Sequence, residues 1–213
     1  MAENIFLFVP NLIGYGRILL ALISFYYMPT NYIVAAVCYL FSGFLDAFDG
    51  HAARILNQST KLGGMLDMLT DRCGTMCLLL TLSAFYPQYV FFFQISVALD
   101  ISCHWLHLHT SLLEGRTSHK AAAANPNMIL QIYYTSRPVL FLMCAGNEFF
   151  YASLYLLNFI EGPTLLFGIG LWRFLAYILF PVAVFKTVLA LMQGYYAAIN
   201  LANIDSEERA KGN

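Results

Sequence analysis

Charged residues are scarce in this sequence, since Asp, Glu, Lys and Arg together make up only 11% of its 213 residues. Hydrophobic residues make up 60% and aromatic residues 16%, and the mean hydropathy is +0.65. A water-soluble domain of this size needs more polar surface than such a composition provides. The shortage of charge therefore excludes an ordinary soluble domain and indicates a protein embedded in a lipid bilayer.

Three other features are missing. The first residues, MAENIFLF, contain Glu3 and no basic residue, so they lack the charged start of a secretory signal peptide and we expect the segment to be retained. Positive charge is not in excess, because the formal net charge is -1, and we expect no nucleic acid among the partners. The five cysteines lie in apolar stretches without C-x-x-C spacing, so we expect no structural disulfide.

Six apolar stretches are long enough to cross the roughly 30 Å hydrocarbon core of a bilayer as helices. They lie near residues 5–28, 31–53, 63–86, 88–112, 138–160 and 164–200. These stretches leave little of the chain for a soluble domain. The sequence therefore predicts an all-α integral membrane protein, in which residues 1–213 form a single domain of six transmembrane helices with an acidic tail over residues 203–213.

Basic residues are distributed unevenly between the connections of the predicted spans. The connections after the second and fourth stretches, and the C-terminal tail, carry Lys and Arg, whereas the opposite connections carry neither. Positive charge marks the cytoplasmic side of a membrane protein. We therefore expect both termini in the cytoplasm, and we expect the sequon Asn57-Gln58-Ser59 to be unmodified because it faces the same side.

Four aspartates interrupt the apolar pattern within 26 residues. Asp46 and Asp49 are three residues apart near the cytoplasmic end of the second span, and Asp67 and Asp71 are four residues apart near the start of the third. Each pair therefore lies on one helix face. A short linker makes the two spans an antiparallel hairpin, which brings the pairs together. Ionisable residues within spans usually face the bundle interior and serve a function.

Four carboxylates this close together need cations, because their mutual repulsion would otherwise prevent all of them from being ionised. Hard oxygen ligands without a His or Cys pair nearby favour Mg²⁺, Mn²⁺ or Ca²⁺. Four such groups can bridge two ions about 3.5 to 4 Å apart, an arrangement that stabilises the attacking and leaving oxygens of phosphoryl transfer. The spacing therefore indicates a two-metal site.

Gly50, Gly63 and Arg54 add features of a phosphate-binding site. Glycines let a ligand or a neighbouring helix approach the backbone, and the planar guanidinium of Arg54 offers paired donors to phosphate oxygens. Two other interpretations remain open on these residues. In one, the glycines serve helix packing while Arg54 pairs with Asp46 or Asp49. In the other, the four acids form the cation-binding ring of a channel or transporter.

Read as D-x-x-D-G-x-x-A-R-x8-G-x3-D-x3-D, residues 46–71 resemble the signature of the CDP-alcohol phosphotransferase family. The fixed residues of that signature are all present: Asp46, Asp49, Gly50, Ala53, Arg54, Gly63, Asp67 and Asp71. An earlier segment, residues 10–17, is similar to the family's opening Pro-Asn-x-x-Thr-x-x-Arg, with Gly14 in place of the threonine.

The resemblance implies six transmembrane helices, two bound divalent ions, Mg²⁺ or Mn²⁺, and displacement of CMP from a CDP-linked lipid by an alcohol. It implies that the metal ligands are Asp46, Asp49, Asp67 and Asp71, with Asp71 also the general base. It further implies that a group of polar and small residues contacts CDP-diacylglycerol: Gly50, Arg54, Thr60, Gly63 and Asn11.

Segments inside and outside the signature indicate which alcohol is used. NIFLFVPNLIGYGR, LDAFDGHAAR, HWLHLH, IYYTSRP and CAGNE are similar to animal members of the family that use inositol. The expected reaction is transfer of the phosphatidyl group from CDP-diacylglycerol to myo-inositol, giving phosphatidylinositol and CMP. The alternatives are the same transfer to a different alcohol, and a divalent-cation transporter. Arg54 disfavours the transporter, because a cation pathway gains nothing from an arginine beside its ligands.

An uncharged polyol such as inositol needs a pocket lined by polar side chains. The fourth predicted span carries Asp100, His104 and His107 toward its end, and the basic residues Lys120 and Arg137 follow it. These five residues are the expected inositol-binding group. The alternative is that the histidines are merely hydrated at the membrane interface and that the basic residues serve only topology.

The resemblance also implies where the protein acts. We expect it in the endoplasmic reticulum membrane, with the active site facing the cytoplasm. Small residues in the final spans allow close helix packing, which is compatible with a homodimer.

Overall fold

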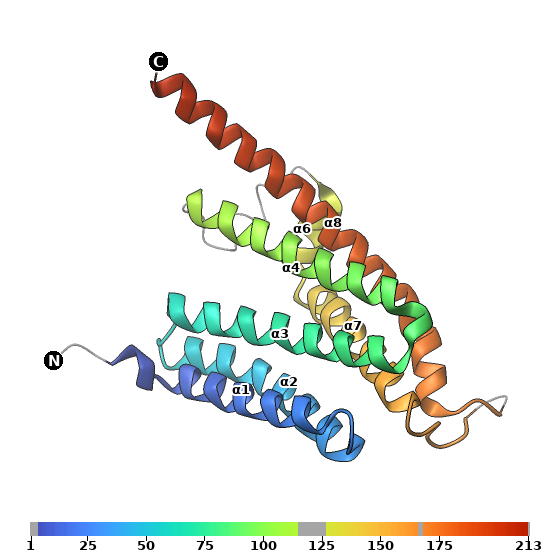
Figure 1. Ribbon diagram of the computed structural model, residues 1–213. Helices are drawn as coiled ribbons and strands as arrows, with labels where there is room; N and C mark the ends of the chain where they lie inside the picture. The colour runs from blue at the N-terminus through green and yellow to red at the C-terminus, as the bar shows by residue number, and fades with distance from the viewer. Residues whose placement is uncertain (1–3, 115–126, 166–167, 213) are drawn as a thin grey trace. The chain divides into compact units, whose positions relative to one another are not determined.

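The computed structural model describes residues 4–114, 127–165 and 168–212 (Figure 1). Within these residues the chain is helical, apart from one isolated antiparallel bridge between Thr164 and Gly170. The chain divides into two compact units. The first comprises Met1–Val90 with Tyr155–Glu161, and the second comprises Phe91–Leu154 with Gly162–Asn213.

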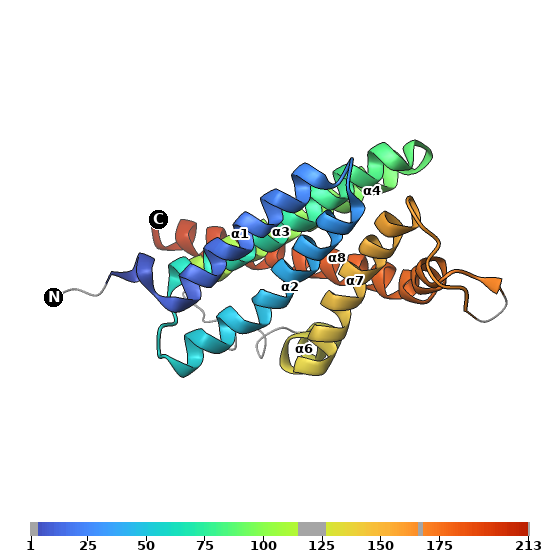
Figure 2. The ribbon, with the colours of Figure 1, turned by 90° about the horizontal axis from the view of Figure 1, so that it is seen from below.

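Three long helices build the first unit: α1 (Val9–Tyr27), α2 (Tyr32–Ile55) and α3 (Lys61–Phe85). A short 3-10 helix, η1 (Ile5–Leu7), precedes α1, and another, η2 (Pro87–Tyr89), follows α3. Figures 1 and 2 show α1, α2 and α3 lying side by side in both views. Short connections between consecutive helices make them antiparallel neighbours.

Local capping residues start the second and third helices. The side-chain oxygen of Asn31 accepts a hydrogen bond from the Val34 amide at the start of α2. The hydroxyl of Thr60 accepts one from the Gly63 amide at the start of α3, at 3.0 Å. Such caps satisfy amide groups that have no partner within the helix.

The loop between α2 and α3 is tight and tied to α1. Asn57 has a φ of 53°, a left-handed conformation common directly after a helix, and the Gln58 amide donates back to the Ala53 carbonyl at 2.9 Å. The side-chain oxygen of Gln58 in turn accepts from the Val9 amide at 3.0 Å, at the start of α1. This loop therefore returns the chain within a few residues and fixes the starts of α1 and α3 near the end of α2.

Small and hydroxyl side chains let α1 and α2 pack closely. The hydroxyl of Ser24 in α1 donates to the carbonyl of the fully buried Ala35 in α2, at 2.8 Å. Further along, the hydroxyl of Ser42 donates to the backbone carbonyl of Arg17, at 3.0 Å. Buried hydroxyls need such partners because water does not reach them. The two bonds fix the register of α1 against α2 and position Arg17.

Aromatic rings pack at the end of the first unit where α1 and α3 finish and α2 begins. Tyr155 donates through its hydroxyl to the Met28 carbonyl at 2.9 Å. The Phe159 ring lies 5.2 Å from the Tyr32 ring and 5.4 Å from the Phe85 ring, measured between centroids. These offset and edge contacts are favourable aromatic geometries. They attach residues 155–161 to the first unit.

Four helices are described in the second unit: α4 (Val90–Leu113), α6 (Met128–Thr135), α7 (Arg137–Leu157) and α8 (Leu171–Gly212). Glycines permit close contacts of α8. A β-carbon on Gly194 would lie 2.7 Å from the sulfur of Cys103 in α4, and one on Gly146 in α7 would lie 2.8 Å from Val182 Cγ1. Close approach of helix backbones through small residues is typical of packing within membranes.

Lys186 is a charged residue within the apolar part of α8. Its ammonium donates to the Tyr133 hydroxyl of α6 and, at 3.4 Å, to the Cys144 sulfur of α7, and it lies 4.7 Å from the centre of the Tyr133 ring. The face of an aromatic ring attracts a cation. Neutral partners on two neighbouring helices thus accommodate the charge.

Five helices of the described residues are long and apolar enough to cross a membrane: Val9–Tyr27, Tyr32–Ile55, Pro87–Leu113, Arg137–Leu157 and Leu171–Lys211. They correspond to five of the six predicted spans. The sixth, α3, has 25 residues and is long enough, but it is less apolar because it carries Asp67, Asp71 and Arg72.

The last helix begins later than the sequence predicted. The described residues between Thr164 and Gly170 form no α-helix, and α8 starts at Leu171. The reason lies just before, where Gly162 has a φ of 74° and turns the chain in a conformation that favours glycine. At its other end α8 continues into the acidic tail, whose charged residues are exposed.

Candidate functional site

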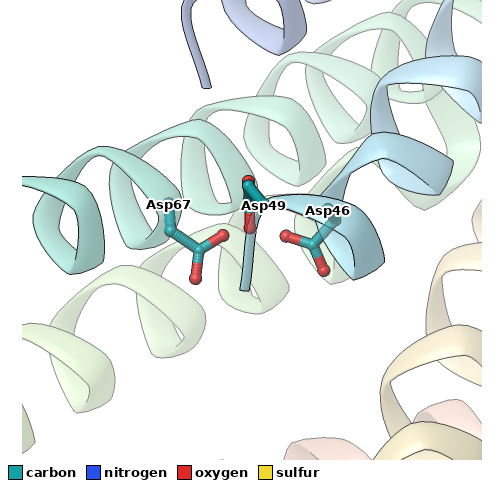
Figure 3. Close-up of side chains that lie close together, drawn as sticks. All are labelled: Asp46, Asp49 and Asp67. Atoms are coloured by element: carbon teal, nitrogen blue, oxygen red, sulfur yellow. The ribbon is translucent and has the colours of Figure 1, made fainter. Parts of the chain in front are cut away.

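The four aspartates of the motif lie on α2 and α3, within the first unit. Asp46 and Asp49 are one turn apart near the end of α2, and Asp67 and Asp71 are one turn apart in the first half of α3. One carboxylate oxygen from each of Asp46, Asp49 and Asp67 lies within 4.8 Å of the other two. Figure 3 shows these three carboxylates turned toward one another. The α2–α3 hairpin therefore brings the two pairs together.

Arg17, on α1, completes the cluster. Its Nη1 donates to Asp49 Oδ2 and Asp67 Oδ1, both at 2.6 Å. Its Nη2 lies 2.6 Å from Asp46 Oδ1 and donates to Asp71 Oδ1 at 2.7 Å. Hydrogen bonds between ionised groups are shorter and stronger than neutral ones. One guanidinium thus contacts a carboxylate of every aspartate in the motif.

The arginine and the aspartates differ in their exposure. The side chain of Arg17 is 2% exposed and that of Asp49 12%, whereas those of Asp46, Asp67 and Asp71 are 40% to 45% exposed. Arg17 therefore reaches the carboxylates from the inside of the helix bundle. The aspartates keep an accessible side, from which an ion or a substrate can approach.

The cluster retains an excess of negative charge. Four carboxylates face the guanidinium of Arg17, so these five residues together carry a net charge of -3 when all of them are ionised. Arg72 adds a more distant cation, with Nη2 3.9 Å from Asp71 Oδ2. Like charges at this spacing repel strongly where water is restricted. The site is therefore built to attract further positive charge.

The donor set fits a divalent metal ion. Oxygens bound to one ion at about 2.1 to 2.4 Å lie at most roughly 4 to 5 Å apart. The carboxylate oxygens of Asp46, Asp49 and Asp67 meet this limit, at 4.8 Å or less. Carboxylates are also the hard ligands that Mg²⁺ and Mn²⁺ prefer. The cluster can therefore hold a metal ion.

Arg54 takes no part in the cluster. It is exposed, and its guanidinium has no ion pair or hydrogen bond with any other described residue. A β-carbon on Gly50 would lie 3.5 Å from Arg54 Nη1, so the guanidinium lies beside the backbone of Gly50. The interpretation in which Arg54 pairs with Asp46 or Asp49 is wrong, because those carboxylates pair with a residue of another helix. Arg54 keeps its donors available for a ligand.

Gly63 lies where α1 and α3 approach each other. A β-carbon at this position would stand 2.9 Å from Asn11 Oδ1 and 3.2 Å from Thr60 Oγ1. Asn11 is 2% exposed and donates through Nδ2 to the Ile5 carbonyl at 2.6 Å. Three of the residues expected to contact the CDP-lipid therefore lie together beside α1, and Asn11 and Thr60 also hold the local backbone in place.

Three of the expected inositol-binding residues lie on α4, in the second unit. Asp100 Oδ1 is 3.4 Å from His104 Nδ1, and the same nitrogen is 2.7 Å from the Asp100 carbonyl oxygen. The His107 ring stacks on the Tyr134 ring, with centroids 5.8 Å apart and planes 11° apart. His104 thus bonds within its own helix, whereas His107 packs against α6.

The two basic members of the expected inositol-binding group are Arg137 and Lys120. Arg137 begins α7, is exposed and has no ion pair with the other described residues. Lys120 lies outside the described residues.

Arg17 is the site residue that the sequence analysis did not assign. A signal was present, because Arg17 is the only charged residue between residues 5 and 28. An arginine within an apolar span must face the bundle interior and find an anionic partner there. The sequence did not indicate which acid would be that partner.

Comparison with known proteins extends these observations. The sequence model of the family described as CDP-alcohol phosphatidyltransferase matches residues 7–159. That range covers all of α1, α2 and α3, with the four aspartates and Arg17. No solved structure gives a significant match.

Curated relatives are similar over nearly the whole chain. The protein named CDP-diacylglycerol–inositol 3-phosphatidyltransferase in Rattus norvegicus is 56% identical over 209 residues, which is 98% of each chain. The protein of the same name in Homo sapiens is 56% identical over the same share of each chain. That of Drosophila melanogaster is 53% identical over 207 residues, 97% of this chain and 90% of the relative.

Proposed function

The chain belongs to the CDP-alcohol phosphatidyltransferase family, and we propose that it transfers the phosphatidyl group of CDP-diacylglycerol to myo-inositol, giving phosphatidylinositol and CMP. The observation that carries this proposal is the 56% identity, over 98% of both chains, to relatives named CDP-diacylglycerol–inositol 3-phosphatidyltransferase. The acidic cluster of the first unit offers the chemistry that such a transfer requires.

Asp46, Asp49, Asp67 and Asp71 would hold two divalent ions, Mg²⁺ or Mn²⁺. The close grouping of the first three carboxylates supports this assignment. When bound, such ions supply positive charge to the phosphate oxygens on which negative charge develops during the transfer. The partial exposure of three of the aspartates leaves the CDP-lipid a way in.

Arg54 binds the diphosphate of CDP-diacylglycerol. Its exposed guanidinium has no carboxylate partner among the described residues, and its fork of donors matches phosphate oxygens. Gly50 lies beneath it and lets the headgroup approach the α2 backbone. Gly63, Asn11 and Thr60 lie together at the start of α3 and are the further contacts of the lipid headgroup.

Asp71 acts as the general base. Its carboxylate accepts the proton of an inositol hydroxyl while the hydroxyl oxygen attacks the phosphorus that carries diacylglycerol. A phosphorus–oxygen bond to inositol forms, the bond between that phosphorus and the CMP oxygen breaks, and CMP leaves. A carboxylate is a weak base for an alcohol, so proton transfer accompanies the attack. Positioning of the two substrates then supplies much of the acceleration.

Inositol binds to polar side chains that the expected group provides: Arg137, Lys120, Asp100, His104 and His107. Arg137 has no ion pair with the other residues that the structure describes, which supports its place in this group. Hydroxyl-rich ligands need several donors and acceptors, which a mixed group of acids, bases and histidines offers.

The whole chain acts as one catalytic domain with six membrane spans, α3 being the sixth. A helix that carries ionisable residues can cross a membrane when those residues face the bundle interior, as the contacts of Asp67 and Asp71 with Arg17 allow. Both termini and the active site face the cytoplasm, and the membrane is that of the endoplasmic reticulum. A homodimer is compatible with the small residues of the last helices.

One assay tests the proposal directly. Purified protein is given CDP-diacylglycerol, Mg²⁺ or Mn²⁺ and a panel of alcohols, and CMP release is measured. We expect release with myo-inositol and not with glycerol 3-phosphate, and none after the ions are removed by a chelator. Release only with another alcohol would overturn the proposed acceptor. No release with any alcohol would overturn the reaction class and favour the cation-transporter alternative.

A further inference from the structure

One guanidinium occupies the centre of the acidic cluster. The two terminal nitrogens of Arg17 stand 2.6 to 2.7 Å from oxygens of Asp46, Asp49, Asp67 and Asp71. These residues come from three helices, and Arg17 is the shared partner that draws them together. Without a cation there, the carboxylates would repel each other across the α2–α3 hairpin.

We propose that Arg17 is a resident counter-cation, which holds the four carboxylates together before the divalent ions bind and competes with those ions for the same oxygens. This inference rests on the proposed function only in that divalent ions enter the aspartate cluster. It makes Arg17 a positioning residue that sets the affinity for metal.

The geometry makes the competition direct. A divalent ion needs carboxylate oxygens at about 2.1 to 2.4 Å, and the nitrogens of Arg17 already stand at 2.6 Å from one oxygen each of Asp46, Asp49 and Asp67. A guanidinium and a metal ion at these distances from shared ligands would repel each other strongly. Binding of metal to these same oxygens therefore requires Arg17 to withdraw from at least some of its contacts.

The surroundings of Arg17 permit such a withdrawal. Its backbone is held by the hydroxyl of Ser42, so the movement is confined to the side chain. Its Nε is buried and has no hydrogen-bond partner among the described residues. Side chains on a helix lean toward its N-terminus. One turn in that direction from Arg17 lies the buried Gly14, and a β-carbon placed on Gly14 would meet no atom within 4 Å. The space beside Gly14 is therefore open on the side toward which the Arg17 side chain leans.

Direct metal binding distinguishes this role from a structural one. Binding of Mn²⁺ without substrate, measured by electron paramagnetic resonance, is compared in the wild type, Arg17→Gln and Arg72→Gln. Competition predicts that the dissociation constant falls by at least about tenfold in Arg17→Gln, since removal of a nearby charge of the same sign as the ion strengthens binding. Arg72 is the matched control, because its Nη2 stands 3.9 Å from Asp71 Oδ2, farther than Arg17 stands from any of the four carboxylates, and its substitution should change the constant much less.

Thermal unfolding gives a second measurement. Without metal, Arg17→Gln should unfold at a lower temperature than the wild type, and added Mn²⁺ should raise its unfolding temperature by more than that of the wild type. A purely structural role would lower both temperatures equally. Arg17→Lys keeps the charge but loses the planar fork, so its metal affinity should lie between those of the wild type and Arg17→Gln.

A third measurement leaves Arg17 intact, in case the variants do not fold. The wild-type protein is labelled with ¹⁵N in its arginine side chains, and Mg²⁺ is added without substrate. The guanidinium signal that is absent from the Arg17→Lys spectrum, or the one slowest to exchange with solvent if that variant is unstable, should shift as the ion binds, because the Arg17 side chain is only 2% exposed. Mn²⁺ affinity that is unchanged or weaker in Arg17→Gln, or a signal that stays fixed at saturating Mg²⁺, would overturn the proposal. None of these readouts uses turnover, so they remain informative if the proposed reaction is wrong.

Discussion

Asn11 Oδ1, on α1, lies 2.9 Å from the position that a β-carbon on Gly63 of α3 would take. At this point the buried side chain of Asn11 occupies the space that a side chain on Gly63 would need. The next residue is different, because a β-carbon on Gly64 would meet no atom within 4 Å. Two adjacent glycines in one helix therefore form a matched pair for testing the contact.

Gly63→Ala should destabilise the protein and impair the reaction. The new methyl group would displace Asn11, which is buried and bonded to Ile5, and overpacking of this kind costs about 1 to 3 kcal/mol. Gly64→Ala should be neutral or stabilising by up to about 1 kcal/mol, because alanine favours a helix. Unfolding temperature and CMP release are measured for both variants. Equal behaviour of the two would contradict the close approach of α1 and α3.

Asp71→Asn should abolish turnover and retain much of the affinity for CDP-diacylglycerol. The amide cannot accept the proton of the attacking hydroxyl, but it keeps the size of the side chain. The matched variant is Asp49→Asn, which should instead weaken metal binding, so that a higher metal concentration is needed for half-maximal activity. Substrate binding and metal titrations of the two variants are compared. Parallel loss of lipid binding and turnover in Asp71→Asn would indicate that Asp71 serves only as a ligand.

Arg54→Ala should lower the affinity for CDP-diacylglycerol at least about tenfold, since a charge-assisted bond to phosphate contributes about 1.5 to 3 kcal/mol. Arg54→Lys should restore only part of it, because an ammonium lacks the fork. The unfolding temperature should hardly change, as Arg54 has no ion pair with the described residues. Lys61→Ala, which removes an exposed positive charge nearby, is the control. If Arg54→Ala and Lys61→Ala lost affinity equally, the loss would reflect the overall positive charge of this region and not a specific bond from Arg54.

The loop between α2 and α3 should face the cytoplasm. Ser59→Cys introduces a thiol at an exposed position of this loop, whereas Glu161→Cys introduces one in a connection expected on the opposite side. In sealed microsomes, a thiol reagent that cannot cross membranes should label Ser59→Cys, and not Glu161→Cys, above the level at which it labels the wild type, whose native cysteines include the exposed Cys73. After detergent is added it should label both. The reverse pattern would invert the proposed topology and place the active site in the lumen.

The helices were largely predictable because their signals are local. Apolar stretches of span length, Asn31 and Thr60 as caps, and the basic connections all act over a few residues. The start of the last helix was predicted too early, near residue 164, because hydropathy alone does not register the turn at Gly162. The small helix α6 was also not anticipated, since eight residues are too few for a periodic signal.

The acidic motif by itself determined the chemistry of the site. Residues spaced three or four apart share a helix face, and a short loop folds one helix back on the next, so the pairing of Asp46 and Asp49 with Asp67 and Asp71 follows from local geometry. Only the tertiary structure decided what those carboxylates contact. Arg17 lies 32 to 54 residues from the aspartates to which it donates. Its role depends on which face of α1 meets α2 and α3, and packing between distant helices sets that choice.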